Sequence, residues 1–269
     1  YGQRRLGTQM KATGEVMAIG RNFESALLKA IRGAEISQDS LRMEKLCALS
    51  EEALREKLLS QDDERVFAVY ECLRRGMPVA DLHVLTGIDE WFLEKLFHLL
   101  CLERGLESGT LTEEKYREAK RYGFPDSVIF RLSGQTVPHL PACYRMVDTC
   151  SAEFAASTPY FYSSSGEEDE AAQFIRDRAS GKPVVMVFGS GPIRIGQGIE
   201  FDFASVHCVW SLKRLGYEVV IVNNNPETVS TDFNVADRLY FEPLTPEDVV
   251  DIIRVEKPAG AVVAFGGQT

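Results

Sequence analysis

The residue pattern with the clearest chemical potential is a glycine-rich segment, GSGPIRIGQG, at positions 189–198. It follows the apolar run Val184–Phe188 and precedes a helical pattern, which is where dinucleotide-binding proteins carry the sequence G-x-G-x-x-G. That sequence needs a third glycine at position 194, where this chain has arginine. Pro192 also removes one of the backbone N–H groups that would bind a pyrophosphate. The segment therefore argues against a dinucleotide site.

A dinucleotide site also needs an acidic residue at the end of the following strand, where it binds a ribose hydroxyl. The following apolar run, Val219–Val222, leads instead into Asn223-Asn224-Asn225. The simpler interpretation is that glycine permits a tight turn from strand to helix, because it has no Cβ atom. The glycines of this turn are Gly189, Gly191, Gly196 and Gly198.

Acidic side chains follow closely behind the same apolar runs. In an open α/β sheet, the carboxyl ends of the strands form the edge at which binding sites are built. A functional role and a purely structural role are equally compatible with the sequence at this point. The residues concerned are Glu200, Asp202, Glu227 and Asp232.

Histidine and cysteine residues indicate neither a metal site nor a catalytic nucleophile. His98 and Cys101 lie within an apolar helical stripe, so a packed histidine is favoured over a metal ligand. His207-Cys208 is a single pair, whereas a zinc site needs a second one. We therefore expect no catalytic residue and no metal ligand here, and we expect Arg74-Arg75 to be solvated surface.

Length and composition indicate a folded protein of two domains. The chain has 269 residues, of which 45% are hydrophobic and 26% charged, and these are ordinary values for a globular chain. Its net charge of −10 excludes a broad nucleic-acid-binding surface. No apolar run approaches the roughly 20 residues that span a membrane. The six cysteines do not resemble a secreted disulfide framework, so we expect thiols in a reducing compartment.

The first half of the sequence is predicted to be mainly helical. Residues 1–21 are typical of loop and short strand, whereas residues 22–132 place apolar side chains at three- and four-residue steps. Ser50, Asp89 and Thr112 stand where a side-chain oxygen could cap the start of a helix. We expect a compact all-helical domain over residues 22–132.

The second half is predicted to contain a parallel sheet. Prolines and serines mark residues 133–182 as an extended linker, with one short acidic helix. In residues 183–269, strand patterns alternate with helical ones, which is typical of a doubly wound sheet. The predicted fold class is α plus α/β, an all-helical domain followed by a Rossmann-like parallel-sheet domain. The strand patterns are Val184–Phe188, Val219–Val222 and Ala261–Phe265.

Several long segments share their residues with one protein family. GSGPIRIGQGIEFD (189–202), NPETVSTD (225–232), DRLYFEP (237–243) and GGQT (266–269) resemble the start of the second half of the carbamoyl phosphate synthetase large subunit. YRMVDTCSAEFAASTPYFYSS (144–164) is similar to the segment just before it, and TGIDEWFL (86–93) to the family's oligomerisation domain. LGTQMKATGEVMAIGR (6–21) resembles the end of the first ATP-grasp domain. The resemblance runs essentially from one end of the chain to the other.

The resemblance implies a piece of a longer ligase. Residues 1–21 would end the first ATP-grasp domain, 22–132 would be the oligomerisation domain, and 183–269 a truncated pre-ATP-grasp domain. The complete enzyme would use bicarbonate, two ATP and ammonia, with the ammonia taken from glutamine by a small subunit. One half would make carboxyphosphate and then carbamate, and the other would phosphorylate carbamate. ATP and its Mg or Mn ions would bind outside this sequence, so the chain would hold no cofactor and would be inactive alone.

The resemblance also implies an internal tunnel that carries carbamate between the two halves. By motif position, Glu15, Glu200 and Glu227 correspond to residues that line it. The implied partners are a small glutaminase subunit, other copies bound through the helical domain, and small-molecule intermediates. The implied location is the cytoplasm, although the sequence leaves a bacterial or an organellar source open. Tyr70, Trp91, Phe92 and Phe97 supply more aromatic area than a small helical core needs, so a self-associating face is expected, although an ordinary core position is the simpler account of any one of them.

A second function class remains open from the sequence. The chain could be a non-catalytic helical interaction module fused to a nucleotide-binding-like α/β domain. ATP-grasp sequences on both sides of these residues would favour the enzyme, whereas stop codons there would favour the module.

Overall fold

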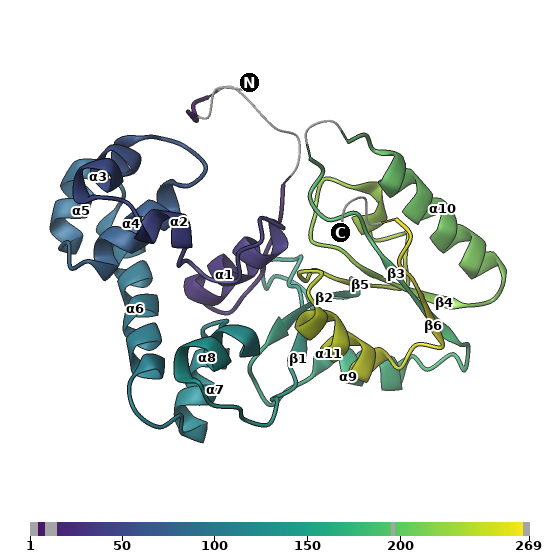
Figure 1. Cartoon of the computed structure of the whole chain (residues 1–269). Coiled ribbons are helices and arrows are strands. Elements are labelled where there is room, and N and C mark those ends of the chain that lie inside the picture. The colour runs from purple at the N-terminus through teal and green to yellow at the C-terminus, as the bar shows by residue number, and fades with distance from the viewer. Residues whose placement is uncertain (1–4, 9–14, 195–196, 266–269) are drawn as a thin grey trace. The chain divides into compact units, whose positions relative to one another are not determined.

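The computed structural model describes residues 5–8, 15–194 and 197–265 (Figure 1). The chain forms two compact units, and each is described by itself. Unit 1 contains residues 1–11 and 37–138, and unit 2 contains residues 12–36 and 139–269. The fold class is the predicted one, since helices fill unit 1 and a mostly parallel sheet with helices forms unit 2.

The described part of unit 1 is built from helices. They are α2 (Glu44–Cys47), α3 (Glu51–Leu59), α4 (Arg65–Arg74), α5 (Val79–Thr86), α6 (Glu90–Glu107), α7 (Glu113–Arg121) and α8 (Asp126–Ser133). The predicted caps are confirmed: Ser50, Asp89 and Thr112 accept hydrogen bonds from the first-turn N–H groups of α3, α6 and α7. These caps satisfy donors that a helix start leaves without an intrahelical partner.

In the core of unit 1, α6 packs against α4, α5 and α8, and α3 packs against α4. Phe67, Leu93 and Val128 are among the buried side chains there. Tyr70, for which the sequence left a self-associating face or an ordinary core position open, is only 1% exposed and belongs to this core. Its position in a buried stretch of α4 therefore excludes it from any surface.

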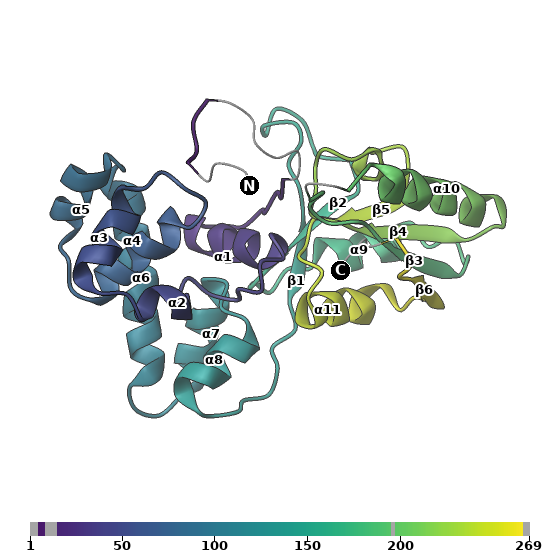
Figure 2. The same ribbon diagram turned by 45° about the horizontal axis from the view of Figure 1, so that its top comes forward.

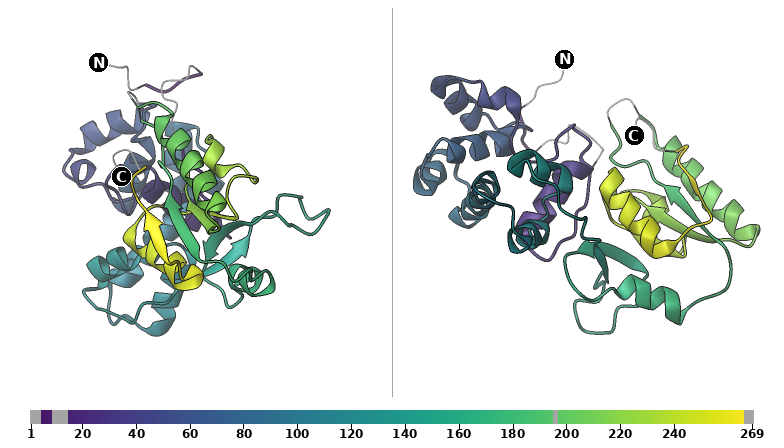
Figure 3. Two further views of the ribbon diagram at one scale, coloured as in Figure 1. Left: turned by 90° about the vertical axis from the view of Figure 1, so that its right-hand side faces the viewer. Right: turned by 60° about the horizontal axis from the view of Figure 1, so that its bottom comes forward.

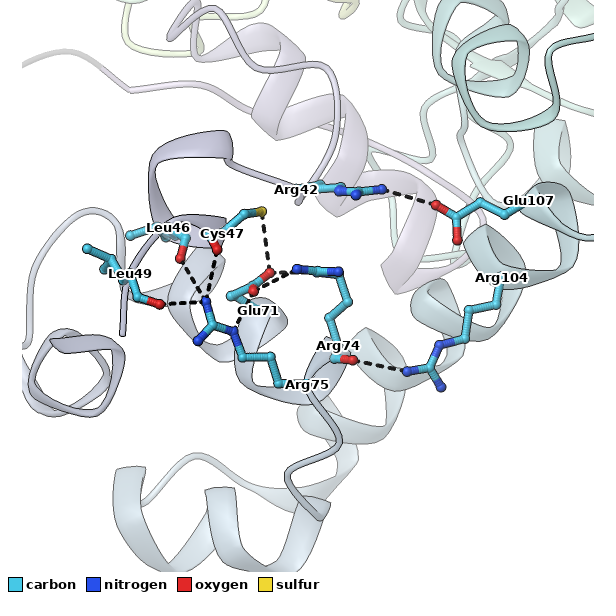
Figure 4. A network of polar contacts seen from close by, with 9 residues as sticks. All are labelled: Arg42, Leu46, Cys47, Leu49, Glu71, Arg74, Arg75, Arg104 and Glu107. Atoms are coloured by element: carbon cyan, nitrogen blue, oxygen red, sulfur yellow. Dashed lines mark hydrogen bonds and ion pairs between the residues drawn. The ribbon is translucent and has the colours of Figure 1, made fainter. Parts of the chain in front are cut away.

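A buried carboxylate on α4 organises the neighbouring chain (Figure 4). Glu71 accepts hydrogen bonds from Arg74 Nε at 2.7 Å and from Arg75 Nε at 2.7 Å. The Arg75 guanidinium also donates to the backbone carbonyls of Cys47 at 3.1 Å and Leu49 at 2.9 Å, beyond the end of α2. Arg75 is exposed and Arg74 is half-buried, so the pair lies at the surface as predicted, but both side chains also neutralise a carboxylate that the fold buries.

Unit 2 contains a six-stranded sheet in the order β1-β2-β5-β4-β3-β6. β1 and β2 are antiparallel, and the other neighbouring strands are parallel. The strands are β1 (Cys143–Met146), β2 (Tyr160–Ser164), β3 (Val184–Phe188), β4 (Glu218–Val222), β5 (Arg238–Tyr240) and β6 (Gly260–Val262). The helices are α1 (Phe23–Gly33), α9 (Glu170–Asp177), α10 (Glu200–Arg214) and α11 (Pro246–Glu256), with a 3₁₀ turn η1 at Val229–Thr231.

The central strands β3, β4 and β5 are buried on both faces, as expected within a parallel sheet. α10 covers one face, where Val206 and Val209 pack against Ile221. α9 and α11 cover the other, where Ile252 packs against Val220. Figure 2 and Figure 3 show the strands between α10 and α11. Because side chains of a strand alternate between faces, consecutive valines of β4 serve both cores.

Two segments depart from the organisation that the sequence suggests. Residues 133–182, expected to be an extended linker, supply β1 and β2 at one edge of the sheet. α1, expected to belong with the other helices, is grouped by its contacts with unit 2. The predicted domain limits themselves stay predictions.

All six cysteines are free thiols, as the sequence predicts. Among the described residues, no helix has both the length and the apolar character that a bilayer crossing requires.

The Glu71 cluster makes unit 1 sensitive to acid. Burial alone would raise the pKa of Glu71, but the hydrogen bonds and charges of Arg74 and Arg75 outweigh burial, and the pKa lies below its ordinary value of 4.5. The stabilisation is therefore present above pH 4.5 and is lost as the pH falls through the lower, folded-state pKa. We predict that Glu71→Gln lowers the free energy of unfolding at pH 7 by roughly 1–3 kcal/mol.

The measurement is urea unfolding of both proteins by circular dichroism, from pH 7 down to pH values below 4.5. The variant should lose less stability on acidification than the parent chain. Glu113→Gln is the control, because its exposed ion pair with Arg117 should contribute under about 0.5 kcal/mol. If Glu71→Gln lost as much stability on acidification as the parent chain does, Glu71 would not be the source of the acid sensitivity.

Candidate functional site

β3 and β4 end side by side, with Phe188 paired to Val222. The predicted glycine-rich turn begins at this point, and the Gly189 N–H donates to the Val222 carbonyl at 2.9 Å. The three asparagines follow β4 directly. This edge of the sheet is where an open α/β fold builds its sites.

The Asn223 side chain packs against the turn after β3. It is fully buried, and its Oδ1 accepts a hydrogen bond from the Gly191 N–H at 3.1 Å. Its Nδ2 donates to Thr228 Oγ1 and Ser230 Oγ, both at 3.3 Å. One amide therefore joins the turn after β3 to the loop after β4, and it satisfies a backbone donor that a nucleotide would otherwise use.

The two following asparagines attach further segments to the same edge. Asn224 Nδ2 donates to the Gly33 carbonyl of α1 at 3.0 Å, and the Asn224 carbonyl accepts from the Met17 N–H at 2.7 Å. Asn225 Nδ2 donates to the Gly191 carbonyl at 3.1 Å. Residues 223–225, called the asparagine cluster below, thus hold four separate stretches of chain together.

Close approach explains why glycine stands in this turn. A Cβ atom at Gly189 would lie 2.4 Å from Asn223 Cγ. Gly191 has a φ of +62°, and a Cβ atom there would lie 2.7 Å from Glu35 Oε1. A Cβ atom at Gly198 would collide with the Glu200 carboxylate. Gly196 lies outside the described residues.

Arg194, which stands where a dinucleotide site needs glycine, holds the end of α1 instead. Its guanidinium donates to the Glu35 carbonyl at 2.9 Å and to Glu35 Oε2 at 3.1 Å. Its backbone N–H donates to Gln197 Oε1 at 3.0 Å. The N–H groups of Gly189, Gly191 and Arg194 therefore all donate within the chain.

Asp202 has a structural role. It is buried, and its two carboxylate oxygens accept from the Val229 N–H at 2.8 Å and the Ser230 N–H at 3.1 Å. It therefore fixes η1 to the first turn of α10. Asp232, by contrast, lies on the surface just after η1.

The three predicted tunnel glutamates are exposed and lie in segments that end at this edge. Glu200 begins α10, which follows the glycine turn. The Glu227 N–H donates to Asn225 Oδ1 at 3.0 Å. Glu15 lies two residues before Met17, whose N–H binds the asparagine cluster. Their side chains have no role in either core.

A buried ion pair at the end of β5 escaped the sequence analysis. Lys29 of α1 lies 2.8 Å from Glu242 Oε1, and it also donates to the carbonyls of Ser163 at 2.8 Å and Ile19 at 3.0 Å. Glu242 further accepts from the Ser163 N–H. Burial raises the pKa of Glu242, although the charge of Lys29 opposes this rise. Lys29 lies among the apolar positions of α1. The sequence around it therefore gives no reason for a buried lysine, and only its distant partner Glu242 accounts for its burial.

The histidines that the sequence analysis considered as ligands pack against aromatic rings. The His98 ring lies 4.5 Å from the Tyr122 ring, edge to face. His207 lies between Phe203 and Trp210, with ring separations of 4.2 and 5.2 Å. Packing is therefore the observed role of both residues.

The fold and this edge define a class of protein: a helical domain joined to a doubly wound α/β domain whose glycine turn is filled by its own side chains. Residues 15–144 match the domain family described as "Carbamoyl-phosphate synthetase large chain, oligomerisation domain". Residues 181–269 match the "Carbamoyl phosphate synthase preATP-grasp domain". The chain belongs to the carbamoyl phosphate synthase large-chain family.

Curated relatives agree with these matches. The chain is 51% identical to a "Carbamoyl phosphate synthase large chain" of Agathobacter rectalis and 50% identical to one of Lachnoclostridium phytofermentans. Each comparison covers 99% of this chain and 25% or 26% of the relative. The chain thus spans about a quarter of the length of these relatives.

The packing of Gly189 against Asn223 gives a stability prediction. Gly189→Ala should lower the free energy of unfolding by about 1–3 kcal/mol, because the added methyl group overpacks a buried amide. In an Asn223→Gly background the same substitution should cost less, since the opposing side chain is gone. Urea unfolding of the four proteins measures both costs.

Gly260→Ala is the matched control, because nothing lies within 4 Å of a Cβ atom there. It should change stability by under about 0.5 kcal/mol. An equal cost of Gly189→Ala in both backgrounds would show that Asn223 is not the residue that demands glycine.

Proposed function

We propose that the chain acts as part of an ATP-dependent ligase that makes carbamoyl phosphate from bicarbonate, two ATP, and ammonia derived from glutamine. The names of the relatives and the two domain families support this proposal. In the large chain, these residues would not form a complete active site. ATP and its Mg or Mn ions would be bound elsewhere, and a small glutaminase subunit would supply ammonia in the cytoplasm for pyrimidine and arginine biosynthesis.

The contribution proposed for unit 2 is a wall of the passage that carries carbamate. The observation that supports it is that the segments of Glu15, Glu200 and Glu227 all reach the carboxyl edge of the sheet, where their carboxylates are exposed. A carboxylate repels an anion from the wall and holds ordered water by accepting hydrogen bonds. Such a wall would let carbamate pass without binding it.

This role predicts that a cation in the wall uncouples the enzyme. In the full-length large chain, Glu200→Lys or Glu227→Lys should trap or obstruct carbamate, because a lysine facing an anionic intermediate forms an ion pair with it. Carbamoyl phosphate output should fall by about a hundredfold. Bicarbonate-dependent ATP hydrolysis and ATP synthesis from carbamoyl phosphate and ADP should both persist, because each needs only one half of the enzyme.

Glu153→Lys is the control, since Glu153 is exposed in the same unit but lies between β1 and β2. It should leave overall synthesis intact. Parallel loss of both partial reactions in Glu200→Lys would make that residue structural. Unchanged synthesis of carbamoyl phosphate would mean that Glu200 is a surface residue without a role in the reaction. Either result would refute the proposal that Glu200 lines the passage.

The contribution proposed for unit 1 is self-association, which its domain family supports by description. Of the aromatic residues considered, Trp91, Phe92 and Phe97 on α6 remain exposed. The Trp91 and Phe92 rings lie 5.0 Å apart, edge to face, and Lys95 lies 5.4 Å from the Trp91 ring. Exposed aromatic side chains of this kind are typical anchors of protein interfaces.

We predict that the double substitution Trp91→Ser and Phe92→Ser weakens self-association by about tenfold or more in Kd. Sedimentation velocity over a range of concentrations measures the effect. Phe130→Ser, which removes an exposed phenylalanine from α8 of the same unit, should leave association unchanged. An equal loss in both variants, or no loss in either, would place the interface elsewhere.

A further inference from the structure

Lys29 is a buried cation whose N–H donors all have acceptors. It lies on α1, is 5% exposed, and its Nζ lies 2.8 Å from Glu242 Oε1. The same Nζ donates to the backbone carbonyls of Ser163 at 2.8 Å and Ile19 at 3.0 Å. An ammonium group has three hydrogens, so these three contacts use all of them. One side chain therefore connects α1 to β2, to the end of β5 and to the segment that precedes α1.

The segment from Glu15 to Ile19, called the Glu15 segment below, carries one of the proposed wall residues. Met17 and Ile19 pack against the core on the α10 face of the sheet. The backbone of the segment is attached at two points. The Met17 N–H donates to the Asn224 carbonyl at 2.7 Å, and the Ile19 carbonyl accepts from Lys29. The second attachment lies four residues from Glu15, so the position of Glu15 depends on Lys29.

A tight turn joins the Glu15 segment to α1. A Cβ atom at Gly20 would lie 2.5 Å from Ser25 Oγ and 2.9 Å from the Ala26 backbone nitrogen, so the chain enters the helix in close contact with its first turn. Asn22 caps that turn by accepting from the Ser25 N–H at 2.7 Å. Because this turn leaves the backbone little freedom, the Glu15 segment and α1 form one body.

The ion pair fixes this body to the sheet in a defined position. Glu242 is fully buried, and its Oε1 also accepts from the Ser163 N–H. A buried ion pair stabilises a fold little more than apolar side chains of similar volume would, because both charges lose their water. Hydrogen bonds are directional, whereas apolar contacts are not. The pair is therefore better suited to setting a position than to adding stability.

We propose that Lys29 and Glu242 are positioning residues for carbamate transfer. Their ion pair holds the Glu15 segment against the carboxyl edge of the sheet, so that the Glu15 carboxylate stays in the wall of the passage. Both residues are buried and act without touching an intermediate. If the segment loosens, carbamate reaches bulk water and is lost, while the chemistry of each half continues. The proposal rests on the function proposed above.

A paired substitution separates positioning from stability. Lys29→Met alone leaves a buried carboxylate without its cation, so this variant should unfold at a lower urea concentration. Adding Glu242→Gln removes the second charge and keeps an acceptor for the Ser163 N–H, so most of the lost stability should return. The Ile19 carbonyl lacks its donor in both variants, and the Glu15 segment should therefore stay loose in both.

The coupling of the full-length large chain is the main measurement, with ammonia supplied as the nitrogen source. In the paired variant, the ATP hydrolysed per carbamoyl phosphate formed should rise by about threefold or more. Bicarbonate-dependent ATP hydrolysis and ATP synthesis from carbamoyl phosphate and ADP should stay within about twofold of the parent enzyme. Native-state amide exchange at Met17 should become at least about tenfold faster, while the amides of β4 keep their protection.

The matched control is the buried ion pair at the other end of β5. Arg238 begins β5, lies 2.9 Å from Glu256 Oε2 and also pairs with Glu218. Arg238→Met combined with Glu256→Gln removes the same kinds of charge from the same strand and keeps an acceptor for the Tyr240 hydroxyl. It should change neither the coupling ratio nor the exchange at Met17.

An unchanged coupling ratio in the paired Lys29 variant, with synthesis intact, would overturn the positioning role. An equal rise in the control would also overturn it, because general loosening of the domain would then be the cause. Parallel loss of both partial reactions would make the pair structural. If the unmodified full-length protein made no carbamoyl phosphate, the proposed function itself would fail. The exchange at Met17 would still decide whether Lys29 holds the Glu15 segment.

Discussion

The carboxyl edge of unit 2 depends on the burial of three amide side chains that only their neighbours can satisfy. A buried amide without hydrogen-bond partners is costly, so Asn223, Asn224 and Asn225 draw the surrounding backbone toward them. The turn after β3 supplies a donor and the end of α1 an acceptor to these side chains, and the Met17 N–H donates to the Asn224 backbone carbonyl. The hydrogen bonds of the asparagine cluster therefore fix the positions of these three segments relative to one another.

This constraint separates the domain from the nucleotide-binding proteins whose strand–turn–helix it shares. Asn223 accepts from the Gly191 N–H, Arg194 binds Glu35, and close packing accounts for Gly189 and Gly191. With the turn filled, the edge presents exposed carboxylates instead of a phosphate cradle. The proposed anion-repelling wall rests on these exposed carboxylates.

Local signals were readable from the sequence, and long-range ones were not. Helix caps such as Ser50 and the valine-rich strand β3 rest on neighbouring residues, and both were predicted correctly. β5 has three residues and no alternation of its own, so its place in the sheet depends on pairing with β2 and β4. Lys29 lies 213 residues from Glu242, and the grouping of α1 with the sheet follows from that contact. The placement of the glutamates came from resemblance, because spacing alone left their roles open.

Amide hydrogen exchange of the chain carrying Asn223→Ala tests most directly whether the asparagine cluster holds the glutamate-bearing segments together. The N–H groups of Met17, Gly191 and Glu227 each donate to this cluster. If the cluster acts as one unit, the protection of all three should fall together, while amides of α4 in unit 1 keep theirs. Loss of protection at Gly191 alone would contradict this account, because the segments would then be held independently.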